Sequence, residues 1–198
     1  MSGLKTICVF CGSSSGRGDG FLAAATALGT LLAQRQIRLV YGGAHIGTMG
    51  AVAQGCLQAQ GQVVGVMPQR LVDREVAHTQ LTELHVVDTM HTRKALMADM
   101  ADAFIALPGG FGTYDELFEI LTWAQIGLHQ KPIGLLNVAG FYTPLLTFLQ
   151  GSVDAGFVQP RHMAMLHVAD TADELLDRLA AAQDAAPVPG KWTVKTDA

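Results

Sequence analysis

Residues 107–116, Leu-Pro-Gly-Gly-Phe-Gly-Thr-Tyr-Asp-Glu, join a glycine-rich turn to the start of a helix pattern. The apolar run 103–107 before the turn is typical of a strand buried on both faces of a parallel sheet. After the turn, apolar residues recur at the spacing of a helix. Because a glycine turn at a helix N-terminus presents backbone N–H groups at the positive end of the helix dipole, this stretch predicts an anion site.

Arg93 is a second residue with the chemistry to bind an anion. It shares a helical stripe with Leu96, Met97 and Met100, which places a guanidinium on the core-facing side of the helix predicted at 90–101. Since that helix begins where a predicted strand ends, Arg93 could reach over the edge of the sheet toward a phosphate. A structural alternative, in which Arg93 snorkels or pairs with a structural carboxylate, stays open.

Glu116 lies near the start of the helix predicted at 113–126. Thr113 and Glu116 match a capping box, in which both side chains only satisfy backbone N–H groups. If Glu116 faces the cleft instead, the helix dipole favours its ionised form, suited to a base, a nucleophile or a stabiliser of positive charge. A phosphate on the glycine turn, with this carboxylate and Arg93 beside it, fits a phosphorylated sugar that becomes cationic during reaction.

Alternating strand and helix patterns must position these residues. Such alternation with short connections predicts an α/β fold, with right-handed crossovers and a mostly parallel central sheet covered by helices on both faces. The expected strands are 6–10, 39–41, 63–67, 84–87, 103–107, 132–136 and 165–168; the expected helices are 21–35, 51–60, 90–101, 113–126, 141–155 and 172–182; residues 68–82 are expected to form a loop or short helix.

Glycine-rich loops at 12–16, 42–50 and 109–112 each follow a predicted strand. They should therefore line one rim, at the carboxyl ends of the strands, where ligands of such sheets bind. The spacing from Gly42 to Gly47 imitates a P-loop, but Thr48 stands where the phosphate-binding lysine should be, and no loop gives the dinucleotide pattern. Triphosphate hydrolysis and nicotinamide chemistry are thereby disfavoured.

Composition narrows the class of protein further. The 198 residues are 49% hydrophobic, 15% charged and carry a formal charge of −4 without a basic cluster, which argues against binding to nucleic acid or a membrane. We expect a single domain over 1–184 and a tail over 185–198. The three cysteines fit a reducing, cytoplasmic compartment, and Cys8 and Cys11 are expected to be packing residues. No metal site or cofactor is indicated.

Taken together, several segments resemble the LOG ("Lonely guy") family of cytokinin riboside 5'-monophosphate phosphoribohydrolases. They are 11–14, 41–43, 49–50, the Met90-x-x-Arg93-Lys94 motif and, above all, Pro108-Gly-Gly-Phe-Gly-Thr-x-x-Glu116. The resemblance implies a Rossmann-like fold, a homodimer, and hydrolysis of AMP-like or N6-substituted adenine nucleoside 5'-monophosphates to free base and ribose 5-phosphate.

The same resemblance assigns roles to particular residues. It implies that Arg93 and Glu116 are the catalytic pair. Substrate or phosphate contacts are expected at Ser13, Gly43, Glu75, Lys94, Gly109, Gly110, Phe111, Gly112, Thr113 and Thr122.

The sequence departs from the family pattern near its second glycine loop and in its central turn. Ala44 replaces a common glycine and would strain the loop at positive φ; Thr48 replaces the usual leucine, and Phe111 the frequent tyrosine. Two alternatives stay open: a nucleotide-binding protein without turnover, and a pyridoxal-phosphate lysine decarboxylase, an older label of the family, in which Lys94 would form the Schiff base.

Overall fold

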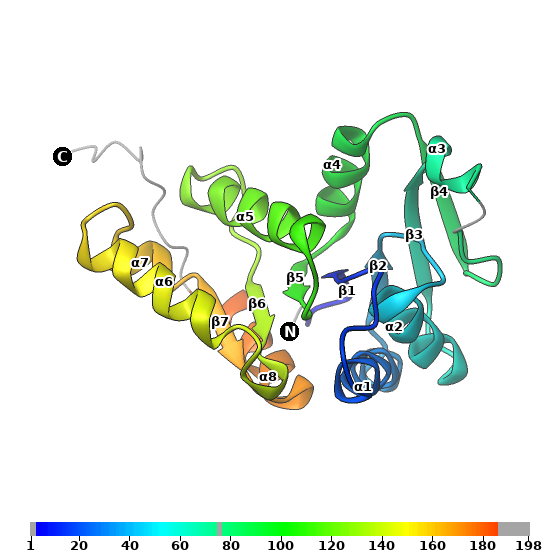
Figure 1. The fold of residues 1–198 in the computed structure, drawn as a ribbon, viewed down its shortest axis with the longest axis horizontal. Helices are drawn as coiled ribbons and strands as arrows, with labels where there is room; N and C mark the ends of the chain where they lie inside the picture. Colours follow the sequence, from blue (N-terminus) through cyan, green and yellow to red (C-terminus); the bar gives the residue numbers. More distant parts are fainter. Residues whose placement is uncertain (1–2, 75–76, 186–198) are drawn as a thin grey trace.

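The computed structural model describes residues 3–74 and 77–185, which are built around a seven-stranded sheet (Figure 1). Every neighbouring pair of strands is parallel, and the strand order is β4-β3-β2-β1-β5-β6-β7. The strands are β1 (Thr6–Phe10), β2 (Arg38–Tyr41), β3 (Val63–Pro68), β4 (Glu83–Val87), β5 (Ala103–Ala106), β6 (Ile133–Leu136) and β7 (Leu166–Ala169).

Helices cover both faces of the sheet, as Figure 1 shows. Residues of α1, α2 and α8 pack on one face, and residues of α4, α5 and α6 pack on the other. The helices are α1 (Gly20–Gln34), α2 (Gly47–Gln58), α3 (Gln69–Val72), α4 (Met90–Met100), α5 (Phe111–Gln125), α6 (Thr143–Asp154), α7 (Pro160–Met163) and α8 (Ala172–Gln183), with a short 3-10 helix, η1 (Val138–Gly140).

Burial on both faces of the sheet explains why the strand sequences are apolar. In β1, Ile7 and Val9 contribute to the core under α1, α2 and α8, whereas Cys8 and Phe10 contribute to the core under α4, α5 and α6. Side chains of a strand alternate between faces, so a strand covered on both sides must be apolar throughout. The predicted α/β fold with a parallel sheet and two helical layers is therefore confirmed.

Several predicted boundaries were wrong. The second glycine loop is shorter than expected because α2 starts at Gly47, so Thr48 and Met49 are helical. Likewise α5 starts at Phe111, two residues before the predicted start. The helix predicted at 141–155 is preceded by η1, and α7 was not predicted at all. Short helices such as α7 lack the repeated apolar stripe on which helix prediction depends.

The order of the strands places the ends of β1 and β5 at a topological switch point. From β1 the chain builds outward through β2, β3 and β4, then returns to place β5 on the other side of β1. The loops that follow β1 and β5 therefore leave the sheet in adjacent positions, where α/β proteins bind ligands. These are the first and third of the predicted glycine loops.

The predicted domain boundary, after residue 184, lies next to the end of the described residues. One sheet runs through the described residues, and of the predicted tail, 185–198, only Ala185 belongs to them. Within the described ranges, no helix has the length and apolarity needed to cross a bilayer.

Candidate active site

A cavity of about 650 Å³ opens at the carboxyl ends of the central strands. Its lining contains most of the predicted site residues: Ser13, Arg93, Gly109, Gly110, Phe111, Gly112, Thr113 and Glu116. Segments separated by more than 100 residues in the sequence thus meet around one space. Another cavity, of about 640 Å³, lies between the α5–β6 connection, β7 and α8 and contains none of the predicted residues.

Four predicted contacts are not part of this lining. Gly43 has φ of +82°, and a Cβ at this position would face Met67 and Leu84; Lys94 is held between α4 and α5 by Asp115 and Glu119. Thr122 is exposed on α5 and its hydroxyl donates to the carbonyl of Phe118. Glu75 lies outside the described residues.

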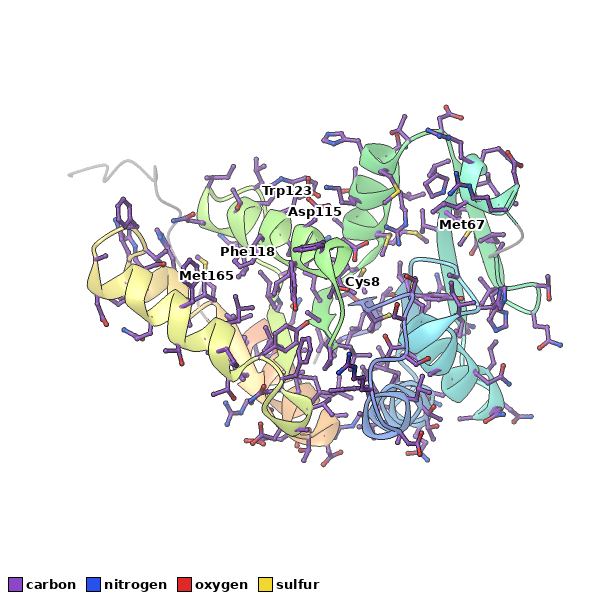
Figure 2. The ribbon with its side chains drawn as sticks, viewed as in Figure 1. Cys8, Met67, Asp115, Phe118, Trp123 and Met165 are labelled. Carbon is purple, nitrogen blue, oxygen red and sulfur yellow. The ribbon has the colours of Figure 1, made fainter. Side chains whose placement is uncertain are left out.

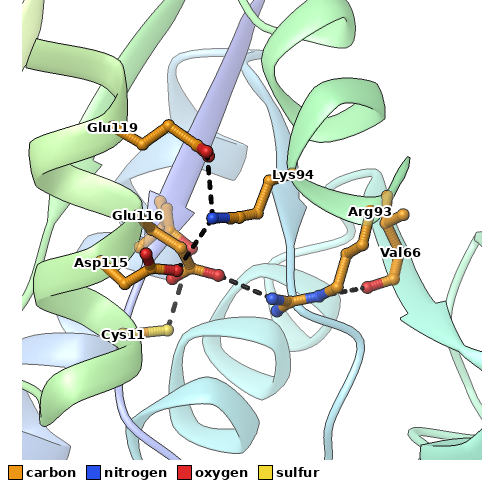
Figure 3. A network of polar contacts seen from close by, with 8 residues as sticks. Cys11, Val66, Arg93, Lys94, Asp115, Glu116 and Glu119 are labelled. Atoms are coloured by element: carbon orange, nitrogen blue, oxygen red, sulfur yellow. Dashed lines mark hydrogen bonds and ion pairs between the residues drawn. The ribbon is translucent and has the colours of Figure 1, made fainter. Parts of the chain in front are cut away.

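Arg93 and Glu116 form a buried ion pair on the wall of the cavity (Figure 3). The distance from Arg93 Nη1 to Glu116 Oε1 is 2.7 Å, and each residue is only 7% exposed. Arg93 also donates from Nε to the carbonyl of Val66 in β3, at 3.0 Å. Because two anchors fix the guanidinium, it is held in one orientation between α4 and α5. Arg93 therefore pairs with a carboxylate, as the structural alternative proposed, but that carboxylate is Glu116, the other predicted catalytic residue.

The guanidinium fits there only because Gly42 has no side chain. A Cβ at this position would lie 2.1 Å from Arg93 Nη2. Gly42 lines the cavity, whereas Gly43, the predicted contact, does not. Sequence reasoning missed Gly42 because a Gly-Gly pair does not indicate which member approaches a side chain from another part of the chain.

The capping box, the structural alternative for Thr113 and Glu116, does not form. Gly110 is the N-cap of α5, with φ −102° and ψ −156°, and no side chain caps the helix. Thr113 and Glu116 therefore lie inside the helix, and both are buried. A glycine readily takes the N-cap conformation, so the helix starts earlier than the Thr-x-x-Glu pattern implies.

Burial controls the charge of Glu116. Desolvation raises the pKa of this carboxyl, and the attraction of Arg93 offsets the effect only in part. The prediction that the helix dipole would favour the ionised form is therefore outweighed by burial. A raised pKa makes the carboxylate a stronger base than an exposed glutamate.

The start of α5 is prepared for an anion. The N–H groups of its first turn have no capping side chain, and the glycines at 110 and 112 leave open space above the backbone. Thr113 is 2% exposed, and its hydroxyl makes no hydrogen bond within the described part of the chain. Buried hydroxyls are nearly always hydrogen-bonded, so Thr113 has an unused hydrogen-bond donor beside the start of α5.

Thr48 ties the first glycine loop to α2. Its hydroxyl accepts from the N–H of Gly12 at 2.9 Å and donates to the carbonyl of the same residue at 3.1 Å. The residue that departs from the family pattern thus fixes a loop of the cavity. Ala44 causes no strain, since its φ is not positive and it pairs with Ala77 in an isolated bridge. Phe111 is 91% exposed at the mouth.

Lys94 binds two carboxylates of α5. Its ammonium lies 3.0 Å from Asp115 Oδ2 and 3.1 Å from Glu119 Oε1 (Figure 3). Partial burial acts to lower the pKa of Lys94, but the hydrogen bonds to Asp115 and Glu119 outweigh it and raise the pKa overall. A Schiff-base lysine needs the opposite shift. The network braces the helices that carry Arg93 and Glu116.

The cysteines behave as packing residues, as predicted. Cys8, Cys11 and Cys56 are free thiols and are buried. Desolvation raises the pKa of both Cys8 and Cys11, which suppresses the reactive thiolate. Among the described residues, no group of His, Cys, Asp and Glu side chains is arranged to hold a metal ion.

Comparison with known proteins identifies the family. Residues 49–179 match a family model described as possible lysine decarboxylase. The chain is 50% identical to cytokinin riboside 5'-monophosphate phosphoribohydrolase LOG7 of Arabidopsis thaliana over 178 residues, covering 90% of this chain and 82% of that protein. It is 46% identical to the Arabidopsis protein LOG5 over 197 residues, covering 98% and 86% of the two chains.

Solved structures share the fold at lower identity. The molybdenum cofactor carrier protein of Chlamydomonas reinhardtii superimposes with a TM-score of 0.70 at 22% identity, over 91% of this chain and 99% of that one. TM1055 gives a TM-score of 0.68 at 23% identity, over 88% and 97%. These likenesses describe the Rossmann-like architecture alone, whereas the family match and the plant sequences covering most of both chains show that this protein belongs to the LOG family.

Proposed function

We propose that the protein hydrolyses the N-glycosidic bond of adenine-type nucleoside 5'-monophosphates, releasing the free base and ribose 5-phosphate. The observation that carries the proposal is the buried Arg93–Glu116 pair, which lies in the same cavity as the uncapped start of α5. Identity near 50% to plant phosphoribohydrolases supports the same activity. Burying two charged side chains costs desolvation free energy, and buried ionisable groups that line a cavity are typical of functional sites.

The 5'-phosphate is assigned to the start of α5. Backbone N–H groups of residues 110–113 would bind its oxygens, and the Thr113 hydroxyl, which has no hydrogen-bond partner among the described residues, would donate to one of them. Ser13 and Gly109 line the same end of the cavity. Gly109 must be a glycine here, since a Cβ would lie 2.1 Å from the Thr113 hydroxyl.

The base is assigned to the opposite, apolar wall. Met67, Leu71 and Met90 line the cavity on the side of β3, α3 and α4. Methionine and leucine side chains suit a flat purine and an apolar substituent on its N6 atom. With the phosphate on α5 and the base on this wall, the ribose would lie over Glu116 and Arg93.

The reaction then uses the carboxylate as charge partner and base. The bond from ribose C1' to the purine nitrogen breaks, and its electron pair leaves with the base. Glu116 stabilises the positive charge that develops on the ribose and orients a water molecule, whose oxygen adds to C1'. One proton of that water ends on the purine. Arg93 holds Glu116 in place and offers a positive charge to the phosphate or the departing base.

A comparison of AMP with adenosine tests the proposal. After incubation with AMP or isopentenyladenosine monophosphate, chromatography should reveal free base and ribose 5-phosphate in equal amounts. Adenosine should remain intact, because it lacks the group that α5 binds. A protein that binds AMP but leaves it intact on prolonged incubation would instead be a nucleotide-binding protein without turnover.

The pH dependence follows from the raised pKa of Glu116. If the anion is the active form, activity is present above this pKa and is lost as the pH falls through it. The acid limb of kcat for AMP should therefore lie above the ordinary glutamate value of 4.5, because burial raises the pKa. A profile of initial rates against pH measures this. An acid limb at the ordinary value would contradict the assignment of Glu116.

We also infer a cytoplasmic homodimer. Support for the dimer comes from exposed apolar side chains: Met90 (48%) and Phe111 (91%) line the cavity, and Phe118 (37%) lies further along α5. Figure 2 shows Asp115, Phe118 and Trp123 along α5. Thr122 lies one turn beyond Phe118, so it would contact substrate only from a partner copy. Light scattering after size exclusion tests the dimer.

The assignment to the cytoplasm rests on the cysteines. Their free thiols support a reducing compartment.

A further inference from the structure

Tyr142 contacts Leu107, the residue that precedes the glycine turn. Its hydroxyl donates to the carbonyl of Leu107 at 2.6 Å, and the residue is 1% exposed. Leu107 immediately precedes Pro108 and the glycines of the cavity, and its own N–H donates to the carbonyl of Phe10 in β1. The last residue before the turn is therefore fixed from two sides, and one of the two anchors is a side chain 35 positions away.

The ring of Tyr142 also supports the other end of the turn. It contacts the ring of Tyr114, with centroids 6.4 Å apart and an interplanar angle of 71°. Tyr114 lies in the first turn of α5, directly after Thr113. One buried side chain thus supports both the strand end and the helix start that enclose the proposed phosphate-binding N–H groups.

The connection that carries Tyr142 is itself tightly specified. The N–H of Tyr142 donates to Asn137 Oδ1 at 2.7 Å, and the N–H of Asn137 donates to the carbonyl of Ala169 at the end of β7. Between them, Ala139 and Gly140 have φ of 52° and 72°. A left-handed alanine persists only where its surroundings determine it, and such backbone gathers near functional sites.

We infer that Tyr142 is a positioning residue of the phosphate site, which fixes the turn 108–112 so that its N–H groups are aimed at the 5'-phosphate before substrate binds. The inference rests on the proposed function for the identity of the ligand. Because the hydroxyl acts on the phosphate cradle and touches neither the base nor the ribose, its loss should weaken phosphate recognition selectively.

The variant Tyr142→Phe tests this with the loss of a single oxygen atom, since it keeps the ring contact with Tyr114. KM for AMP should rise on the order of tenfold while kcat stays within about threefold, because phosphate binding is shared by ground state and transition state. The inhibition constant of ribose 5-phosphate should rise by the same factor, and that of adenine should not change. Equal weakening of both inhibitors, or no weakening, would overturn the inference.

Thr30→Val is the matched control. The Thr30 hydroxyl has two carbonyl acceptors, Thr26 in its own helix at 3.1 Å and Gly55 across the α1–α2 contact at 3.3 Å, and Thr30 does not line the cavity. The control also loses a hydroxyl that bridges two elements, so it separates loss of stability from loss of positioning. Its melting temperature should fall, with KM for AMP and the ribose 5-phosphate constant unchanged. If KM for AMP rose in Thr30→Val as much as in Tyr142→Phe, both increases would be due to loss of overall stability and not to loss of positioning.

Two readouts do not depend on turnover. Amide hydrogen exchange of a peptide covering residues 107–113 should be faster in Tyr142→Phe than in the wild type, and unchanged in Thr30→Val. Calorimetric titration with ribose 5-phosphate should give a weaker affinity for the tyrosine variant. If the wild type binds ribose 5-phosphate but does not hydrolyse AMP, the proposed function fails and the positioning role stands. Unchanged exchange and affinity would refute the role whatever the activity.

Discussion

Glu116→Gln should lower kcat for AMP hydrolysis by about 10³-fold, within the range that a catalytic acid or base contributes. The amide retains the shape of the carboxyl and an oxygen that accepts from Arg93 Nη1, which now lies 2.7 Å from Glu116 Oε1. It has neither the negative charge that stabilises a cationic ribose nor the basicity to activate water. Nucleotide affinity should stay within a few-fold, as measured by calorimetric titration with a non-hydrolysable analogue.

Glu119→Gln is the control for that experiment. Glu119 lies one turn further along α5 and binds Lys94 at 3.1 Å, but it does not line the cavity. The same chemical change at this position should alter kcat by less than about threefold, as for a partly exposed ion pair. If Glu116→Gln retained near-wild-type rates, Glu116 would have only a structural role in the buried pair.

Arg93→Met should have the second largest effect. Removing the guanidinium leaves Glu116 in a buried position without its charge partner, and breaking a buried pair in this way costs roughly 3–5 kcal/mol. Loss of the positive charge also raises the pKa of Glu116 further, since Arg93 is the main group that opposes desolvation. We expect kcat/KM for AMP to fall at least about 10²-fold and the acid limb of the remaining activity to move to higher pH.

Arg93→Lys and a double variant separate charge from stability. The lysine keeps the charge but cannot hold both Val66 and Glu116 in the geometry of the guanidinium, so part of the stability should return while kcat/KM stays low. The double variant Arg93→Met/Glu116→Leu should recover stability without activity, because no uncompensated charge remains buried. A single Arg93→Met variant with wild-type stability and an unmoved acid limb would disprove the coupling.

The sequence predicted those parts of the site whose signals are local. Apolar strands followed by glycine turns indicated both the parallel sheet and the rim where a ligand would bind. The stripe that contains Arg93 placed it on the inner face of α4, and burial of Arg93 at 7% exposure agrees. Glu116 was identified as a candidate from its distance to the same turn.

Other parts depend on contacts between distant segments, which leave no local pattern. Tyr142 meets Leu107 across the end of the sheet, and nothing in its own neighbourhood distinguishes it from a core aromatic. Gly42 is needed because Arg93 approaches it from α4. Thr48 was noted for breaking the P-loop pattern and for departing from the family, but not for a structural role, although it secures the Gly12 loop.

The predicted start of α5, at Thr113 instead of Phe111, was wrong for a simple physical reason. A threonine followed three positions later by a glutamate usually signals a capped helix, but here the helix begins at Phe111 with Gly110 as its N-cap. The helix therefore presents uncapped N–H groups. Neither residue of the apparent capping box caps the helix: Thr113 lies in the proposed phosphate site, and Glu116 pairs with Arg93. The local rule fails at the position where we place the phosphate.

The most direct test of the account is a time course of AMP consumption by the wild type and by Glu116→Gln, with bound nucleotide measured in the same samples. The account predicts that the wild type releases adenine and ribose 5-phosphate in equal amounts, and that the variant binds AMP with similar affinity but releases almost none. Intact AMP bound to the wild type, or equal release by both proteins, would contradict it.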